Sequence, residues 1–215
     1  MLAPRLDAAF AAAAAILPTP MECAVRSIRP RRWWCLALVL CLLGACASAP
    51  AVRDTRSVLP LQPLMGTWYV IAHIPYFTER GHVAARDDYT LLDDGRIGVH
   101  YVYRTGFHAP VKSLDATATV LPGTGNRDWR LRFFRVVPAT QRILEVAPDG
   151  RWMLLTTPDH KLAWIFSRTP GMSGKTYQDL LHKLRDYGIN SDKVWRIAQT
   201  PDQVGGLGFE RPNDD

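Results

Sequence analysis

Histidine and cysteine side chains are the first candidates for chemistry in this chain of 215 residues. Metal sites built from them need short, fixed spacings, such as two histidines one helical turn apart or paired cysteines. The six histidines form no such pair; they are His73, His82, His100, His108, His160 and His182. The sequence therefore predicts no metal site and no cofactor.

Serine and carboxylate chemistry has equally little support. Ser113 and Ser167 lack the glycines that surround a nucleophile on a strand-to-helix turn. The acidic residues are dispersed, so no carboxylate pair stands out for general acid–base work. From residue 46 onward, 21 basic residues face 18 acidic ones, a surplus too small to indicate nucleic-acid binding. We therefore predict that the protein is not an enzyme and binds no nucleic acid.

One cysteine does lie in a context that predicts chemistry. All four cysteines fall within the first 46 residues, so the remainder has no disulfide framework. A basic stretch ending at Arg32 precedes an uncharged apolar run over residues 33–43, as in a secretory signal peptide. Leu43-Gly44-Ala45-Cys46 then resembles a bacterial lipobox. The resemblance implies acylation of Cys46, and several acyl chains anchor a protein stably to a membrane.

The leader sets the expected domain boundaries. Met21 is an alternative start that would give a leader of more usual length. Ala47 rather than Asp follows the cysteine, and the lipobox resemblance then implies lipid anchoring to the cell outer membrane, on its periplasmic side. The expected parts are an extension and signal peptide over 1–45, a tether over 46–60, a folded domain over 61–200 and a flexible tail over 201–215.

Short strand-like segments occupy most of the expected domain. In one of them Val99, Tyr101 and Tyr103 alternate on one face, and Asp93-Asp94-Gly95 before it marks a hairpin turn. Eight such segments joined by short turns predict an antiparallel meander, closed as a barrel or folded as a sandwich. The segments are 64–75, 83–92, 96–104, 112–121, 128–136, 141–147, 151–157 and 161–168.

One helix and one short strand are expected after the meander. Ser173 suits a helix N-cap, apolar residues recur at helical spacing after it, and Gly188 suits the C-terminal end. Residues 194–197 form the expected final strand.

Two motifs at the ends of this pattern resemble those of lipocalins. Gly66-Thr67-Trp68 is similar to the first-strand motif, and residues 162–170, with Arg168, are similar to the last-strand motif. Residues 76–81 resemble the bacterial outer-membrane lipoprotein lipocalins. The resemblance implies an all-β, eight-stranded antiparallel up-and-down barrel with one C-terminal α-helix and a short final strand. It also implies that Arg168 lies across Trp68 and closes the barrel.

The barrel interior is then the expected binding site. Strict alternation on the first strand places Val70 and Ala72 inward with Trp68. The expected ligand-binding residues are Val70, Ala72, Tyr101, Tyr103, Trp164 and Phe166, each of which could equally serve as plain core. An apolar calyx implies a fatty acid or lysophospholipid ligand, held or transported by a monomer or weak homodimer. A lipocalin-fold enzyme acting on a lipid-like substrate and a protein-binding module using the loops remain as alternatives.

Overall fold

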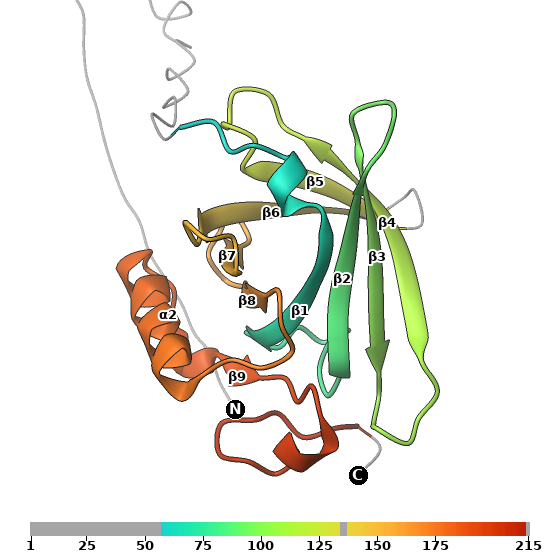
Figure 1. Cartoon of the computed structure of the whole chain (residues 1–215), viewed down its shortest axis with the longest axis vertical. Helices are drawn as coiled ribbons and strands as arrows, with labels where there is room; N and C mark the ends of the chain where they lie inside the picture. The colour runs from blue at the N-terminus through green and yellow to red at the C-terminus, as the bar shows by residue number, and fades with distance from the viewer. Residues whose placement is uncertain (1–56, 134–136, 214–215) are drawn as a thin grey trace, which may run out of the picture. The chain divides into compact units, whose positions relative to one another are not determined.

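The computed structural model describes residues 57–133 and 137–213, which form an antiparallel β-barrel (Figure 1). Each strand pairs with the next one along the chain, and β1 pairs with both β2 and β8, so the sheet closes on itself. The predicted eight-stranded lipocalin barrel is confirmed. Its strands are β1 (Gly66–His73), β2 (Val83–Leu91), β3 (Ile97–Arg104), β4 (Lys112–Val120), β5 (Asp128–Phe133), β6 (Val137–Val146), β7 (Trp152–Thr156) and β8 (Ala163–Ser167).

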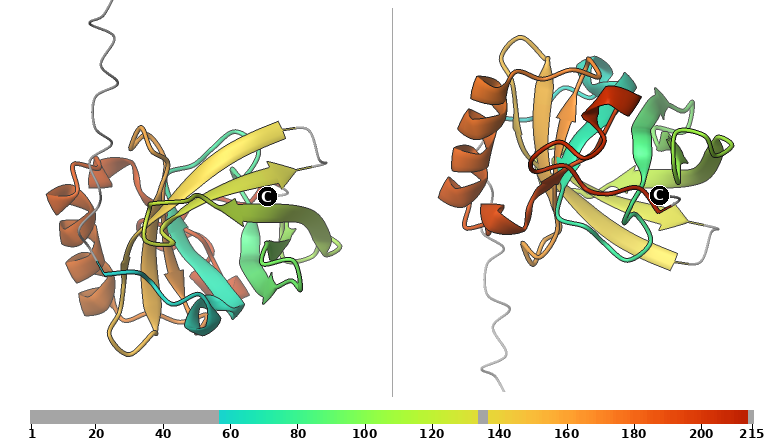
Figure 2. Two further views of the ribbon diagram at one scale, coloured as in Figure 1. Left: turned by 90° about the horizontal axis from the view of Figure 1, so that it is seen from above. Right: turned by 90° about the horizontal axis from the view of Figure 1, so that it is seen from below.

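The one α-helix among the described residues, α2 (Gly174–Asp186), packs against the outside of the barrel (Figures 1 and 2). The Ser173 side chain accepts a hydrogen bond from the Thr176 backbone N–H, as expected of an N-cap. Within the described ranges, no helix is long and apolar enough to cross a membrane.

The chain turns away from α2 at Gly188, whose φ of 77° lies in the left-handed region that glycine adopts without strain. The expected short final strand follows as β9 (Trp195–Arg196), which pairs with the end of β1. Together α2 and β9 cover the outer face of β1 and its neighbours, so this side of the barrel wall is buried on both faces.

Two apolar clusters lie on opposite sides of the barrel wall. The inner cluster includes Trp68, Val70, Trp129 and Phe166, which fill the lower part of the barrel. The outer cluster joins the buried stripe of α2 to the sheet; it comprises Ile71, Ala72, Ile74, Leu144, Leu154, Ala163, Ile165, Tyr177, Leu180, Leu184 and Ile189. Successive residues of a strand point to opposite faces, and this alternation supplies both clusters from the same strands.

A β-bulge in β1 interrupts that alternation. Val70 pairs with Phe166, but Ala72 pairs with the very next residue of β8, Ile165, so one extra residue lies on β1 at Ile71. Ala72 consequently packs with the outer cluster under α2. The expected inward orientation of Ala72 is therefore wrong, because strict alternation from Trp68 does not survive the bulge. His73 pairs with Trp164 beyond it.

The segment after β9 completes the barrel wall. The β1–β2 ladder ends at the pair Tyr69 and Arg86, and beyond this point the two strands are bridged by residues 197–199. The Ala84 N–H donates to the Ala198 carbonyl at 2.8 Å. The Gln199 amide donates to the carbonyls of both Val70 and Ala85, at 2.8 and 3.1 Å. A buried side chain thus satisfies the backbone groups that the diverging strands leave open.

Residues 201–213 were expected to be flexible, and here the structure differs. The Glu210 N–H donates to the Arg196 carbonyl at 2.8 Å, and the Asn213 amide donates to the Arg80 carbonyl at 2.7 Å. The Arg196 guanidinium also lies over the Phe209 ring, 4.4 Å from its centroid. Glycine-rich composition suggested mobility, but backbone pairing holds this segment across one end of the barrel (Figure 2).

Candidate ligand-binding site

One end of the barrel is closed by Trp68 and Arg168. The Arg168 guanidinium carbon lies 3.7 Å from the centroid of the Trp68 ring, the contact that the sequence resemblance implied. Arg168 also donates to the carbonyls of Thr67 and Pro63, at 2.8 and 2.6 Å. The indole N–H of Trp68 donates to the Leu64 carbonyl at 2.8 Å, which fixes the short helix η1 (Gln62–Leu64) beneath the barrel. Every polar group of this pair is satisfied, so this end is a seal.

A layer of large side chains from three strands lies above the seal. The rings of Tyr89 on β2 and Trp129 on β5 meet edge to face, with centroids 5.4 Å apart. The Gln141 amide on β6 donates to the Tyr89 hydroxyl at 3.4 Å. Because these strands are spread around the barrel, the layer forms a floor across its interior. We call Tyr89, Trp129 and Gln141 the floor.

The wall above the floor combines small side chains with partly exposed aromatic ones. Ala85 and Ala116 belong to the inner cluster and take up little volume. Tyr101, Tyr103 and Trp164 pack against the same cluster yet remain partly exposed, although they face the barrel interior. Exposure of inward-facing rings means that solvent-sized space lies beside them. This part of the interior is the candidate ligand site.

The expected ligand-binding residues divide into three groups. Val70 and Phe166 are buried in the inner cluster next to each other on β1 and β8. Tyr101, Tyr103 and Trp164 line the wall above the floor. Ala72 lies outside the barrel, as described above, and Cys46 lies outside the described residues.

A buried histidine between two glutamates lies at the open end, which we call the mouth. His73 is fully buried; its Nε2 lies 2.8 Å from a Glu210 oxygen and its Nδ1 lies 3.5 Å from a Glu79 oxygen. Burial alone would lower the pKa of His73, but the hydrogen bonds and charges of Glu210 and Glu79 raise it. Burial likewise opposes ionisation of Glu79, yet hydrogen bonds from His73 and Trp164 hold its pKa below the ordinary value. The contact between His73 and Glu210 ties the C-terminal segment to β1.

A second histidine belongs to an aromatic stack on the same wall. The His82 ring stacks on Tyr103 with centroids 3.8 Å apart, and Tyr103 stacks on Tyr101 at 5.1 Å. His82 Nδ1 lies 2.9 Å from the Tyr101 hydroxyl. Burial lowers the pKa of His82 to about 4, so its ring is neutral at neutral pH. The stack presents aromatic faces rather than charge.

Asp87 is the most unusual residue of this wall. It pairs with Trp68 on β1 and with Tyr101 on β3, both of which face inward, so its side chain faces inward too. The Tyr89 hydroxyl donates to it at 3.3 Å, and no described Lys or Arg forms an ion pair with it. Burial, together with the charge of Glu79, raises the pKa of Asp87 to about 8. The inner wall therefore carries a carboxyl group without a cationic partner.

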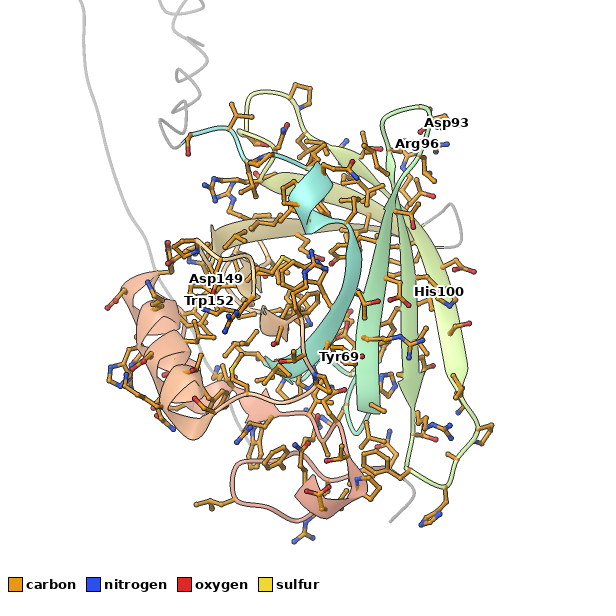
Figure 3. All side chains as sticks on the ribbon, in the orientation of Figure 1. Tyr69, Asp93, Arg96, His100, Asp149 and Trp152 are labelled. Carbon is orange, nitrogen blue, oxygen red and sulfur yellow. The ribbon has the colours of Figure 1, made fainter. Side chains whose placement is uncertain are left out.

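Sequence reasoning missed these polar residues. A signal for Asp87 was present, because it alternates with Ala85 and Tyr89 along an expected strand. Glu210 gave no signal, since it belongs to the segment expected to be flexible. Other charged groups, including His100 and the hairpin pair Asp93 and Arg96, lie on the outer surface (Figure 3). Among the described residues, no group of three potential ligands could hold a metal ion.

Comparison with known proteins assigns the chain to a family. A family model described as a lipocalin-like domain matches residues 59–199. The chain belongs to the lipocalin-like family. Members of this family are generally non-enzymatic proteins that bind small hydrophobic ligands, and their site is the barrel interior described above.

Curated relatives of this lipocalin come from plants and bacteria. Temperature-induced lipocalin-1 of Arabidopsis thaliana is 28% identical over 155 residues, which cover 66% of this chain and 80% of the relative. The outer membrane lipoprotein Blc of Citrobacter freundii is 28% identical over 163 residues, which cover 74% of this chain and 90% of Blc. These are distant relatives, one named as a lipocalin and the other as an outer membrane lipoprotein.

Solved structures show the same fold at much lower identity. Lobster apocrustacyanin A1 superposes with a TM-score of 0.54 at 13% identity, covering 65% of this chain and 79% of its own. Insecticyanin of the tobacco hornworm Manduca sexta gives a TM-score of 0.53 at 16% identity, covering 76% and 89%. At this identity the likeness concerns the fold alone.

Proposed function

We propose that this lipocalin holds a single-chain lipid in the barrel interior, above the floor and below the mouth. The observation that carries the proposal is the inner wall itself, where small residues such as Ala85 and Ala116 leave room and Tyr101, Tyr103 and Trp164 keep partly exposed faces. An apolar, concave and largely dry wall binds an apolar chain through burial of its surface. Fatty acids and lysophospholipids are the ligand classes of this shape.

The proposed location is the cell outer membrane, with the acylated Cys46 as anchor. The lipobox-like sequence that ends at Cys46 supports this location, and so does the kinship with Blc, whose name places it in the outer membrane. Such an anchor would keep the barrel close to the lipids that it holds, for storage or maintenance of the envelope.

The ligand site is tested with a series of straight-chain alcohols titrated into the purified protein by calorimetry. Each added methylene should improve binding by up to about 0.8 kcal/mol until the interior is full. Val70→Trp places a large ring inside and should weaken binding strongly, whereas Val111→Trp, on an exposed loop, is the matched control and should not. Affinity that does not change with chain length, or equal binding by a folded Val70→Trp protein, would contradict an internal site.

The anchor is tested separately with Cys46→Ser. The variant should appear in soluble or unprocessed fractions, because no thiol remains to carry the lipid. Unchanged membrane fractionation, with an unchanged mass of the processed protein, would contradict acylation at Cys46.

Enzymatic turnover of a lipid-like substrate is the second candidate, and one observation favours it. Asp87, with its pKa raised to about 8 by burial, is a carboxylic acid at neutral pH and lies on the inner wall beside Tyr101. Such a group donates protons readily. Chromatography of the lipid after incubation decides the matter: product that disappears with Asp87→Asn supports an enzyme, and intact lipid supports a carrier.

A further inference from the structure

The polar groups of the inner wall define the chemistry of the ligand's head. We infer that this barrel binds an amphiphile with an ammonium head group, which lies between the carboxyl groups of Asp87 and Glu79 and against the rings of Tyr101 and Tyr103. The inference rests on the proposed lipid-binding function and specifies its ligand class. The proposed head-group site lies on the wall above the floor. It is separate from the apolar residues that contact the ligand's hydrocarbon chain.

The groups that would contact the head come from separate elements but face one space. Asp87 lies beside Tyr101 across the β2–β3 ladder, and Tyr101 stacks on Tyr103. Glu79 enters from the β1–β2 loop, where the Trp164 indole N–H donates to one of its oxygens at 3.0 Å. The charges of both Glu79 and Asp87 act on the Tyr101 hydroxyl, so both carboxyl groups lie within electrostatic reach of it.

Carboxyl groups outnumber cationic groups around this space. His73 lies between the carboxyl groups of Glu79 and Glu210. Asp87 adds a third carboxyl group, which is protonated at neutral pH and forms no ion pair with a described Lys or Arg, and His82 is neutral. Lys112 on β4, which pairs with Tyr103, is a cation at the exposed rim of the described wall.

Aromatic faces beside carboxyl groups are the arrangement that recognises ammonium ions. A cation over a tyrosine face is attracted by the ring quadrupole, and more strongly when water is excluded. A nearby carboxylate adds a direct charge interaction in surroundings of low dielectric constant. The same groups repel the head of a fatty acid, which would find only Lys112 at the rim. A cationic head therefore fits this wall better than an anionic one.

The experiment compares three amphiphiles with the same chain and different heads: decyltrimethylammonium, decanol and decanoate. They are titrated by calorimetry into the purified protein at neutral pH, below the concentrations at which they form micelles. Decyltrimethylammonium should bind at least about tenfold more tightly than decanoate, a difference within the range of one cation–π contact with a nearby charge. Decanol should bind with intermediate affinity.

Two substitutions assign the preference to its residues. Glu79→Gln keeps the size of the side chain and removes its charge, and Asp87→Asn removes a carboxyl group that a bound cation can hold in its ionised form. Each should reduce the preference for decyltrimethylammonium over decanol several-fold. Glu145→Gln, whose glutamate pairs with Lys183 outside the barrel, is the matched control and should change nothing. Because Glu79 also holds His73, the circular dichroism spectrum of each variant establishes that it is folded.

The pH dependence gives an independent test. Burial raises the pKa of Asp87 to about 8, so affinity for the permanently charged decyltrimethylammonium should rise as pH increases through this value. Deprotonation of His73, whose pKa is raised by Glu210 and Glu79, would act in the same direction. The part of the rise that is due to Asp87 should be missing in Asp87→Asn.

The outcomes separate this inference from the proposed function. If decanol and decanoate bind at least as well as decyltrimethylammonium, the ammonium inference fails while the internal lipid site stands. If the preference exists but survives both Asp87→Asn and Glu79→Gln, the assignment to this wall is wrong. If none of the three amphiphiles binds, the proposed function itself fails.

Discussion

The two ends of the barrel are closed by different chemistry. At the sealed end, Arg168 lies on the Trp68 ring and donates to backbone carbonyls, so its charge meets no ionisable partner. At the mouth, His73 contacts Glu79 and Glu210, and the pKa values of His73 and Glu79 are shifted in opposite directions by their contact. The first arrangement depends little on pH and the second depends on it strongly.

Because of this difference, we expect the sealed end to govern stability and the mouth to govern ligand access. The sealed end is built from strands and η1 and buries its aromatic residue completely. The mouth is built from a loop, the end of β1 and the C-terminal segment, which are joined by the contacts of His73 and by the hydrogen bond from Asn213 to Arg80. We therefore expect substitutions at the sealed end to affect folding most and those at the mouth to affect both stability and binding.

The largest effect is expected at the sealed end. Trp68→Ala removes a fully buried indole and should lower the free energy of unfolding by about 3–5 kcal/mol, measured by denaturant titration. Trp195→Ala, whose ring is 46% exposed, is the control and should change it by less than about 1 kcal/mol. Similar losses of unfolding free energy in both variants would mean that the buried Trp68 stabilises the fold no more than an exposed tryptophan does.

A smaller effect is expected at the mouth. Glu210→Gln keeps the shape of the side chain but removes the charge that His73 contacts at 2.8 Å. Hydrogen bonds to charged groups contribute about 1.5–3 kcal/mol, and the loss of unfolding free energy should fall in this range. Glu145→Gln, from a more exposed pair with Lys183, should lose no more than about 1 kcal/mol. Equal losses of unfolding free energy in the two variants would contradict a larger stabilising contribution from the buried His73.

The pH dependence of stability sharpens the same contrast. Because the pKa of His73 is raised in the folded protein, its ion pairs stabilise the fold fully when the pH is below 6.5, the ordinary pKa of histidine. This stabilisation is lost as the pH rises through the pKa of His73 in the folded state. The raised pKa of Asp87 acts in the same direction, since ionising this buried carboxyl above its ordinary range destabilises the fold. Glu79, with its lowered pKa, stabilises at neutral pH and loses its contribution in acid.

Denaturant titrations from acid to alkaline pH test these signs. Because of Asp87, stability should fall as pH rises from 3.8 to about 8 in the wild type, and it should fall less over this range in Asp87→Asn. Arg168→Ala, at the sealed end, should lower stability by a similar amount at every pH in this range. A fall that is the same in Asp87→Asn as in the wild type would remove Asp87 from this explanation.

The smallest effect is the coupling within the seal. A cation over an indole contributes about 0.5–2 kcal/mol, and the double variant of Trp68 and Arg168 should be less destabilised than the sum of the single variants by this amount. Strict additivity would show that the two side chains do not stabilise each other, despite their 3.7 Å separation.

The sequence was sufficient for most of the fold. Alternation and turn residues predicted the strands because each of these signals is local, and Ser173 predicted the start of α2 for the same reason. The bulge at Ile71 could not be predicted, since it depends on how β1 meets β8 and residues 197–199. That single extra residue reversed the orientation expected for Ala72.

The candidate site was only partly predictable. Tyr101, Tyr103 and Trp164 lie on the inner wall, as alternation suggested. The group of His73, Glu79 and Glu210 joins residues far apart in the chain. His73 and Glu210 are separated by 137 positions, so no local sequence pattern could predict their contact. The contact forms only when the C-terminal segment folds across the end of the barrel.

The central claim is that the space between floor and mouth holds a lipid, and native mass spectrometry tests it most directly. Protein purified from cells under native conditions should carry one lipid-sized adduct per chain in the wild type and in the exposed-loop control Val111→Trp. The adduct should be missing from Val70→Trp, whose ring fills the interior. An adduct that persists in folded Val70→Trp, or a wild-type protein that carries none, would contradict the claim.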